Sequence, residues 1–352
     1  MFSLKFISAS QEYTTFTRFV PAPYLRRSFT LAQLPAAATV TICGLGFYEL
    51  FINGVRITKG ALAPYVSNPD HILYYDRYNV LSHLRPGENV IAVMLGNGML
   101  NCPGGAIWDF QLARFRSAPK LALAYEAEED NGEKTCFEAD EQFRCAPSPI
   151  YFDDLRAGEF YDARREIPGW NLPDFDDSGW QPALHAETPR GECRLCQAEP
   201  IVTTQTLRPI AIRRAKIGKL PHPWEMPESM EAEGVEAQTE GWLYDFGVNA
   251  AGLCRLRVRG KAGQKIVMQF GEALDDAGNL DLRGMFFLPQ GLNHRDIYIC
   301  KGEDEEIYLP SFTYHGFRYC LALGLAEEQA TEELLSYQVM NSDLHRMGGT
   351  KP

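Results

Sequence analysis

The chain has 352 residues, of which 45% are hydrophobic and 23% charged, and this is the composition of an ordinary globular protein with about two domains. Its 34 basic and 46 acidic residues give a formal charge of −12, which argues against nucleic acid and anionic membranes as main partners. No apolar run approaches the ~18 residues of a membrane span, and the start, MFSLKFISASQEY, does not match a signal peptide. We therefore expect a cytoplasmic protein.

Strand signals dominate the chain. Short alternating runs, rich in β-branched and aromatic residues, predict strands, and Asn-Gly pairs at 53–54 and 131–132 predict hairpin turns. Only residues 326–335, AEEQATEELL, predict a helix. Many short strands and few helical stripes indicate an all-β fold of two antiparallel, jelly-roll-like β-sandwiches in tandem. The runs cover residues 24–31, 38–54, 88–96, 119–128, 252–260, 264–272, 295–302 and 317–324.

The boundary between the two sandwiches is expected near residue 200. Residues 185–240 are rich in proline, and residues 225–240 contain six Glu and no basic residue, which is typical of a solvated loop or linker. We therefore predict a first domain over residues 1–200 and a second over residues 201–345.

The nine cysteines do not form a recognisable metal or disulfide pattern. Several lie within strand-like runs, where Cys behaves as a small apolar residue. Cys193 and Cys196 have the spacing of a metal-ligand pair, but no second pair or His-x-x-x-His run completes a zinc site. Reduced structural thiols are the better interpretation.

Motifs for several kinds of catalysis are absent from the sequence, including a Gly-rich phosphate loop, a G-x-S-x-G elbow and a His-Glu-x-x-His helix. His315 lies in the aromatic run TYHGFRY, where a hydrogen-bonded structural role is the more typical one. Neighbouring acids such as Asp153–Asp154 and Asp275–Asp276 usually cap turns. Glycoside cleavage requires two carboxyl groups ~5–9.5 Å apart, a separation that no sequence pattern here establishes.

Two loops carry residues suited to sugar contact, which needs a flat apolar face beside fixed amides and carboxylates. The first, LAPYVSNPDHILYYD (62–76), contains Asn68 and Asp70. The second loop, LGNGMLNCPGGAIWDF (95–110), contains Asn97, Asn101, Trp108 and Asp109. In the alternative interpretation, Trp108 of the second loop caps the edge of the sandwich and the polar groups hold turns.

FYELFINGVRITKGALAPY (47–65) and YYDRYNVLSHLRPGENVIAVMLGNG (74–98) resemble the N-terminal β-sandwich of the bacterial α-L-rhamnosidases, glycoside hydrolase family 78. Residues 160–180 are similar to the later part of that domain, and residues 244–272 and 298–324 resemble the second, concanavalin-like sandwich. VMNSDLHRMGG (339–349) is similar to the connector before the family's (α/α)₆ barrel, so residues 346–352 are expected to begin that connector.

The resemblance implies an accessory role. In the family, the general acid and base lie in the helical barrel, whose motifs do not occur in this sequence, so no catalytic residue can be assigned here. Intact relatives hydrolyse terminal α-L-rhamnosides with inversion. The expected partners are a catalytic barrel and rhamnose-containing glycosides, and the face that meets the barrel should be an exposed apolar patch.

In some relatives the first sandwich binds rhamnose with the help of a calcium ion. The corresponding turn here is Ser67–Asn68–Pro69–Asp70, in which Pro69 stands where a second polar ligand is expected. This departure argues against calcium, which requires several oxygen ligands, so we expect no cofactor. Two alternatives to the accessory role stay open: a free-standing, lectin-like rhamnose-binding module, and an enzyme that uses acidic loops of the second sandwich.

Overall fold

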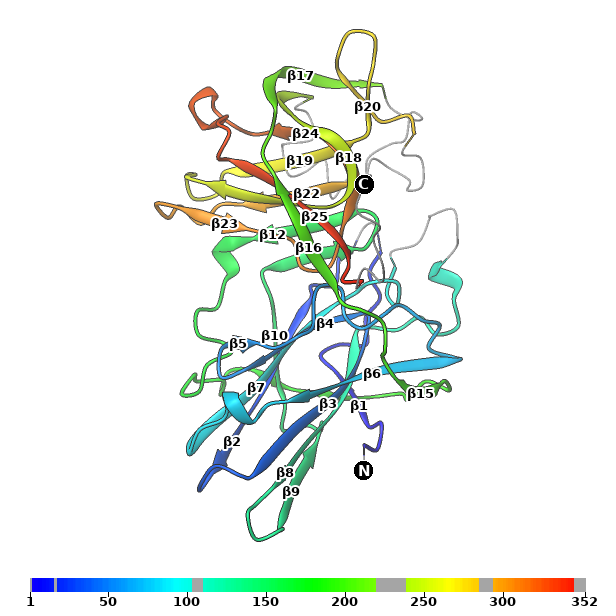
Figure 1. Ribbon diagram of the computed structural model, residues 1–352, viewed down its shortest axis with the longest axis vertical. Coiled ribbons are helices and arrows are strands. Elements are labelled where there is room, and N and C mark those ends of the chain that lie inside the picture. Colours follow the sequence, from blue (N-terminus) through cyan, green and yellow to red (C-terminus); the bar gives the residue numbers. More distant parts are fainter. Residues whose placement is uncertain (1, 16–17, 103–109, 220–238, 285–293, 345–352) are drawn as a thin grey trace, which may run out of the picture.

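A computed structural model describes residues 2–15, 18–102, 110–219, 239–284 and 294–344 (Figure 1). Within these ranges the regular structure is strands and short 3₁₀ turns, and no α-helix occurs, so the predicted all-β class is confirmed. The strands form two lobes along the long axis of the molecule. The 3₁₀ turns are η1 (Leu81–His83), η2 (Phe110–Leu112), η3 (Ala163–Arg165) and η4 (Glu327–Gln329).

The lower lobe of Figure 1 contains two sheets. One has the strand order β14 (Leu184–Ala186), β1 (Phe6–Ser8), β8 (Lys120–Glu128), β3 (Ala37–Leu45), β6 (Ile72–Asn79) and β15 (Glu192–Leu195), with β9 (Lys134–Glu138) also paired to β8. The other has the order β13 (Gln181–Pro182), β10 (Arg144–Pro147), β2 (Pro23–Leu31), β7 (Gly87–Gly96), β4 (Phe47–Ile52) and β5 (Val55–Arg56).

A shared hydrophobic core holds these two sheets together. It takes alternate residues from both, as the two-residue period of a strand requires, for example Val40 and Ile42 from β3 with Ile91 and Val93 from β7. Asn53 and Gly54 form the tight β4–β5 turn with positive φ angles of 48° and 86°, which confirms the hairpin predicted there.

The upper lobe is built on one 12-stranded sheet. Its long strand β18 (Glu240–Val258) has an irregularity between Asp245 and Ala250, where Gly247 has a φ of 81°. The main order is β11 (Ile150–Asp154), β12 (Gly158–Asp162), β22 (Arg295–Ile299), β19 (Lys265–Gly271), β24 (His315–Leu323), β18, β17 (Ala211–Lys219), β21 (Leu280–Asp281) and β20 (Ala273–Leu274). Strands β23 (Glu306–Tyr308) and β25 (Leu335–Ser342) pair with β18, and β16 (Ile201–Leu207) pairs with β25.

Side chains on both faces of this sheet are buried. Along β19, Ile266 and Met268 enter one hydrophobic cluster, whereas Val267 between them enters another on the opposite face. The hairpin β11–β12 comes from the first half of the sequence, but it joins this sheet through parallel pairing of β12 with β22, Phe160 lying opposite Ile297. The domain boundary expected near residue 200 stays a prediction. The hairpin β11–β12 shows that the chain also passes between the lobes at an earlier point, which the sequence patterns did not indicate.

One local prediction was wrong, and one predicted run is divided into two strands. Residues 326–335 form only the short turn η4 before Leu335 begins β25, where it pairs with Leu256 of β18. A helix of that length is marginal on its own, so burial of Leu334 and Leu335 in the sheet decides the local structure. The run 38–54 is interrupted at Gly46, whose φ is 94° and whose added Cβ would lie 2.1 Å from the Gly96 carbonyl oxygen.

Candidate functional site

The predicted sugar-contact residues lie in three different environments. Asn68 is exposed, and its side-chain oxygen accepts a hydrogen bond from the Asp70 backbone N–H at 2.9 Å, so it stabilises the turn. Asp70 lines a cavity, described below. Trp108 and Asp109 lie outside the described residues.

Asn97 and Asn101 are buried, with exposed fractions of 1% and 0%. The Asn97 amide donates to Asp153 Oδ1 at 2.7 Å, and its own oxygen accepts from Asn101 Nδ2 at 2.7 Å. The Asn101 oxygen in turn accepts from the Thr14 N–H. The side chains of Asn97 and Asn101 therefore form hydrogen bonds to other protein groups and connect neighbouring segments. Sugar contact at these two positions stays a prediction.

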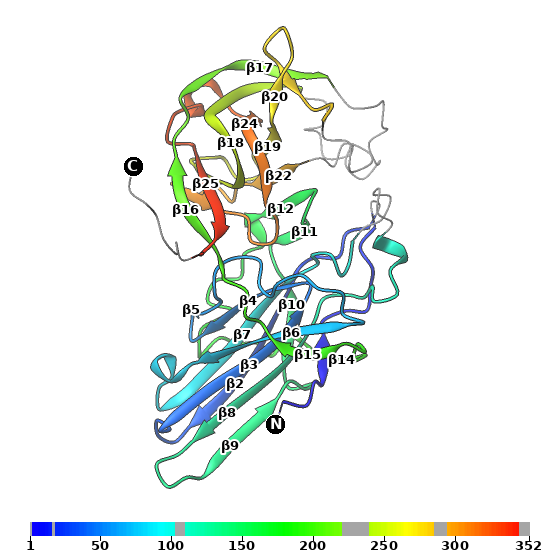
Figure 2. The ribbon, with the colours of Figure 1, turned by 45° about the vertical axis from the view of Figure 1, so that its right-hand side comes forward.

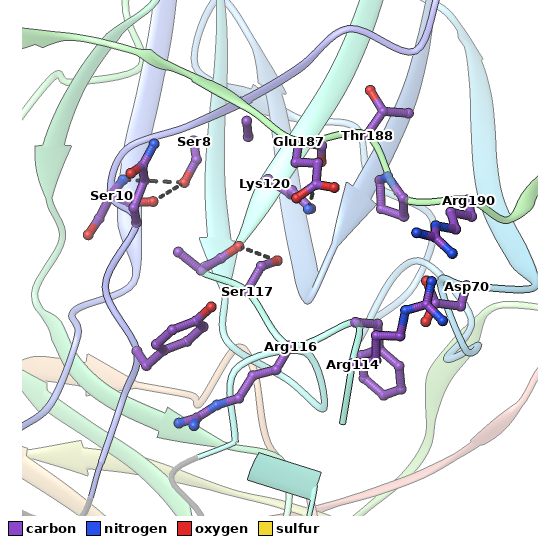
Figure 3. A pocket seen from close by; sticks show the side chains of 16 residues that line it. Ser8, Ser10, Asp70, Arg114, Arg116, Ser117, Lys120, Glu187, Thr188 and Arg190 are labelled. Atoms are coloured by element: carbon purple, nitrogen blue, oxygen red, sulfur yellow. Dashed lines mark hydrogen bonds between the residues drawn. The ribbon is translucent and has the colours of Figure 1, made fainter. Parts of the chain in front are cut away.

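The cavity at Asp70 has a volume of about 480 Å³, within the size range of small-ligand sites (Figure 3). We call it the basic pocket. Strand pairing explains its position, because β1 lies between β8 and β14 and brings Ser8 opposite both Lys120 and Leu184. Its charged lining residues are Arg114, Arg116, Lys120, Arg190, Asp70 and Glu187, and its aromatic ones are Tyr13 and Phe115.

Lys120 and Arg116 are fixed by the protein. The Lys120 ammonium, in a residue only 6% exposed, donates to the Glu187 carbonyl oxygen at 2.8 Å. Burial lowers the pKa of Lys120, and the nearby Glu187 opposes this effect. Arg116 donates to the Thr14 carbonyl at 2.7 Å, and its guanidinium lies 4.7 Å from the centre of the Tyr13 ring.

Arg114 and Arg190 are exposed, and Figure 3 shows them on the same side of the pocket as Asp70. Among the residues that the structure describes, neither makes a hydrogen bond or an ion pair. The lining therefore contains four basic side chains, two of them without a partner among the described residues, and two acidic ones. This excess of basic groups contrasts with the formal charge of −12 of the whole chain.

Sequence reasoning missed these basic residues. A signal was present in ARFRSAPK (113–120), where three basic residues fall within seven positions. Arg190 lies far from them in sequence. It follows β14, which pairs with β1, and the N–H of its neighbour Gly191 donates to the Pro69 carbonyl oxygen beside Asp70.

A second cavity, which we call the junction groove, lies where the two lobes meet and has a volume of about 300 Å³. It is lined mainly by apolar groups, of which Tyr65, Val66 and Tyr314 are exposed, Tyr65 by 62%. Strand β25 ends beside it, because the Asp343 N–H donates to the carbonyl oxygen of Pro200, one of the lining residues. The views in Figures 1 and 2 both place β16 and β25 side by side next to the lower lobe.

Buried acids close to the contact between the lobes have structural partners. Both oxygens of Glu159 accept hydrogen bonds, from the backbone N–H groups of Ser311 and Phe312 at 2.9 Å each and from the Tyr308 hydroxyl at 3.1 Å. Burial raises the pKa of Glu159 to about 8. Asp296 accepts from the Glu159 N–H at 3.0 Å and is hydrogen-bonded to His315 Nε2 at 3.0 Å. These groups are enclosed in the protein core.

No group of three or more His, Cys, Asp or Glu side chains placed to hold a metal ion was found within the described ranges. Cys193 and Cys196 are both free thiols. The described part of the chain also contains no helix long and apolar enough to span a bilayer.

Solved structures with the same fold identify the class of protein. An α-L-rhamnosidase from Dictyoglumus thermophilum has a TM-score of 0.81 and 32% identity over 97% of this chain. An α-L-rhamnosidase from Streptomyces avermitilis, solved in complex with L-rhamnose, has a TM-score of 0.78 and 28% identity over 92%. The fold is that of a tandem of β-domains from a glycoside hydrolase.

Family models narrow this class further. Residues 33–205 match the α-L-rhamnosidase N-terminal domain, and residues 235–340 match the bacterial α-L-rhamnosidase concanavalin-like domain. The chain therefore belongs to the α-L-rhamnosidase family, as its sequence resemblance indicated. A curated α-L-rhamnosidase from Formosa agariphila is 29% identical over 333 residues, which cover 93% of this chain and 32% of that protein. The Dictyoglumus thermophilum enzyme is covered to 36% of its length, so this chain spans about a third of these relatives.

Proposed function

We propose that this chain is the non-catalytic N-terminal portion of an α-L-rhamnosidase, which packs against the catalytic (α/α)₆ barrel and shapes access to its cleft. The main support for the proposal is the extent of the structural match: 97% of this chain aligns with only 36% of the Dictyoglumus thermophilum enzyme. In this role the chain contributes surfaces rather than catalytic groups, and intact relatives would hydrolyse rhamnose-containing glycosides.

The junction groove is the surface that suits the barrel. It exposes Tyr65, Val66 and Tyr314 from both lobes, and removal of such apolar area from water stabilises a contact by ~25 cal/mol per Å². Asp343, directly after β25, lies beside the groove. A module joined there would meet the groove without a long connection.

A chimera tests this role. The corresponding third of the Dictyoglumus thermophilum enzyme is replaced by this chain, and hydrolysis of nitrophenyl α-L-rhamnoside and the melting temperature are measured. We expect the chimera to be active, and Tyr65→Ser with Tyr314→Ser to lower both its activity and its melting temperature. Leu34→Ser, at an exposed apolar residue outside both the groove and the basic pocket, is the control. An inactive chimera, groove variants indistinguishable from the control, or hydrolysis by this chain alone would refute the proposal.

A second candidate function is direct binding of rhamnose. It is supported by the solved Streptomyces avermitilis relative, described in complex with L-rhamnose, and by the location of Asp70 in a pocket here. Titration of the chain with L-rhamnose, with and without calcium, tests it by NMR. Chemical-shift changes that saturate at millimolar sugar would support binding, and their absence at such concentrations would exclude it.

A further inference from the structure

The basic pocket combines two kinds of polar group that one ligand could satisfy together. Arg114 and Arg190 present planar guanidinium groups without a partner among the described residues, and such groups bind carboxylates through two parallel hydrogen bonds. Asp70 and Glu187 contribute carboxylates, which accept hydrogen bonds from hydroxyl groups. A ligand with one acidic group and several hydroxyls would match both sets.

The same carboxylates argue against a multiply charged anion. A phosphate or a polyanion would gain from the four basic side chains but would be repelled by Asp70 and Glu187. The Tyr13 and Phe115 rings add apolar surface for the C–H groups of a ring. The volume of about 480 Å³ is sufficient for a small ligand rather than for an ion alone.

We propose that the basic pocket binds a carboxylate-bearing sugar, that is, a uronic acid unit of a glycan, with Arg114 and Arg190 on the carboxylate and Asp70 and Glu187 on hydroxyl groups. Lys120 and Arg116, which the protein already holds, keep the pocket electropositive. This inference goes beyond the accessory role and does not depend on it, because the pocket lies wholly in the lower lobe and shares no lining residue with the junction groove.

Calorimetric titration of the chain at low salt with D-glucuronate, D-galacturonate, D-glucose and inorganic phosphate tests the proposal. We expect at least one uronate to bind about tenfold or more tightly than glucose and than phosphate. Glucose lacks the carboxylate that would form charge-assisted hydrogen bonds, and phosphate lacks the ring hydroxyl groups. Added salt should weaken the uronate complex.

The double variant Arg114→Gln with Arg190→Gln should lose about tenfold or more in uronate affinity. Its melting temperature should stay that of the parent, because both side chains are exposed. Arg77→Gln, an exposed arginine on β6 outside the pocket, is the matched control and should bind as the parent does. Equal affinity for uronates and glucose, equal or tighter binding of phosphate, or an unchanged double variant would each overturn the proposal.

Discussion

The buried carboxyl of Glu159 should make the stability of this protein depend on pH. Its side chain is fully enclosed and accepts hydrogen bonds from Ser311, Phe312 and Tyr308. Because burial raises its pKa from 4.5 to about 8, the folded state holds the proton over a range in which the unfolded state has released it. Stability from this group is therefore complete below pH 4.5 and is lost as the pH rises toward 8.

The size of the effect follows from the two pKa values. A separation from 4.5 to about 8 corresponds to at most ~5 kcal/mol of unfolding free energy. Glu159→Gln removes the ionisable group but retains an oxygen that can accept from the two backbone N–H groups. Relative to the parent, the variant should gain ~1.4 kcal/mol per pH unit between pH 5 and about 7.5. At pH 5 the two proteins should be nearly equal.

Urea unfolding, followed by tryptophan fluorescence at several pH values from 5 to 9, measures this difference. Comparison of variant and parent at each pH cancels the titration of groups distant from Glu159. Asp153, whose pKa burial raises to about 7, interacts electrostatically with Glu159, so the difference reports Glu159 together with this interaction. Glu332→Gln, at an exposed carboxylate, is the control and should give a flat difference. A flat difference for Glu159→Gln, or one that falls as the pH rises, would refute the reasoning.

Two further substitutions probe how the described segments are held together. Phe312→Ala should lower the free energy of unfolding in urea by ~3–5 kcal/mol. The reason is that this buried ring from the upper lobe lies parallel to Phe47 of the lower lobe, with 6.4 Å between the ring centres. A decrease below ~1 kcal/mol would contradict this packing. Arg26→Met should lower the free energy of unfolding by ~3–5 kcal/mol, because the buried guanidinium pairs with Asp177 and donates to the Leu172 carbonyl oxygen. Residues 170–180 should then become more sensitive to proteolysis, and unchanged resistance of this segment would argue against that role.

Local patterns in the sequence were sufficient for most strands. Residues 24–31, 88–96 and 119–128 alternate apolar and polar or β-branched side chains, and they became β2, β7 and β8 within one residue at each end. Asn53–Gly54 predicted a turn because both residues tolerate a positive φ. These signals act over a few residues, which is why they can be read without the tertiary structure.

The pairing of distant strands could not be predicted in this way. β12 joins the upper sheet through β22, which lies more than 130 residues later, and nothing in the short run GEFYD specifies that partner. The predicted helix at 326–335 failed for a similar reason, since β18 supplies the partner that turns Leu335 into a strand residue. Long-range pairing outweighed local preference at both places.

The candidate site was predictable only in part. Asp70 was chosen as a polar residue in a turn suited to sugar contact, and the structure places it in a pocket. Asn97 was chosen for its sugar-compatible amide, but burial beside Asp153 gives that amide a protein partner. The sequence does not indicate burial for a polar residue in a Gly-rich loop, because burial depends on which strand packs above it.

The lobes meet through contacts that fix the shape of the junction groove. Asp153 of β11 accepts hydrogen bonds from both the backbone and the side chain of Asn97, and Phe312 fills the space above Gly96, where an added Cβ would lie 2.4 Å from its ring. Since the groove takes Tyr65 from one lobe and Tyr314 from the other, loss of these contacts should alter the groove. The basic pocket lies within one lobe, so Phe312→Ala should weaken docking of a catalytic module while uronate binding persists.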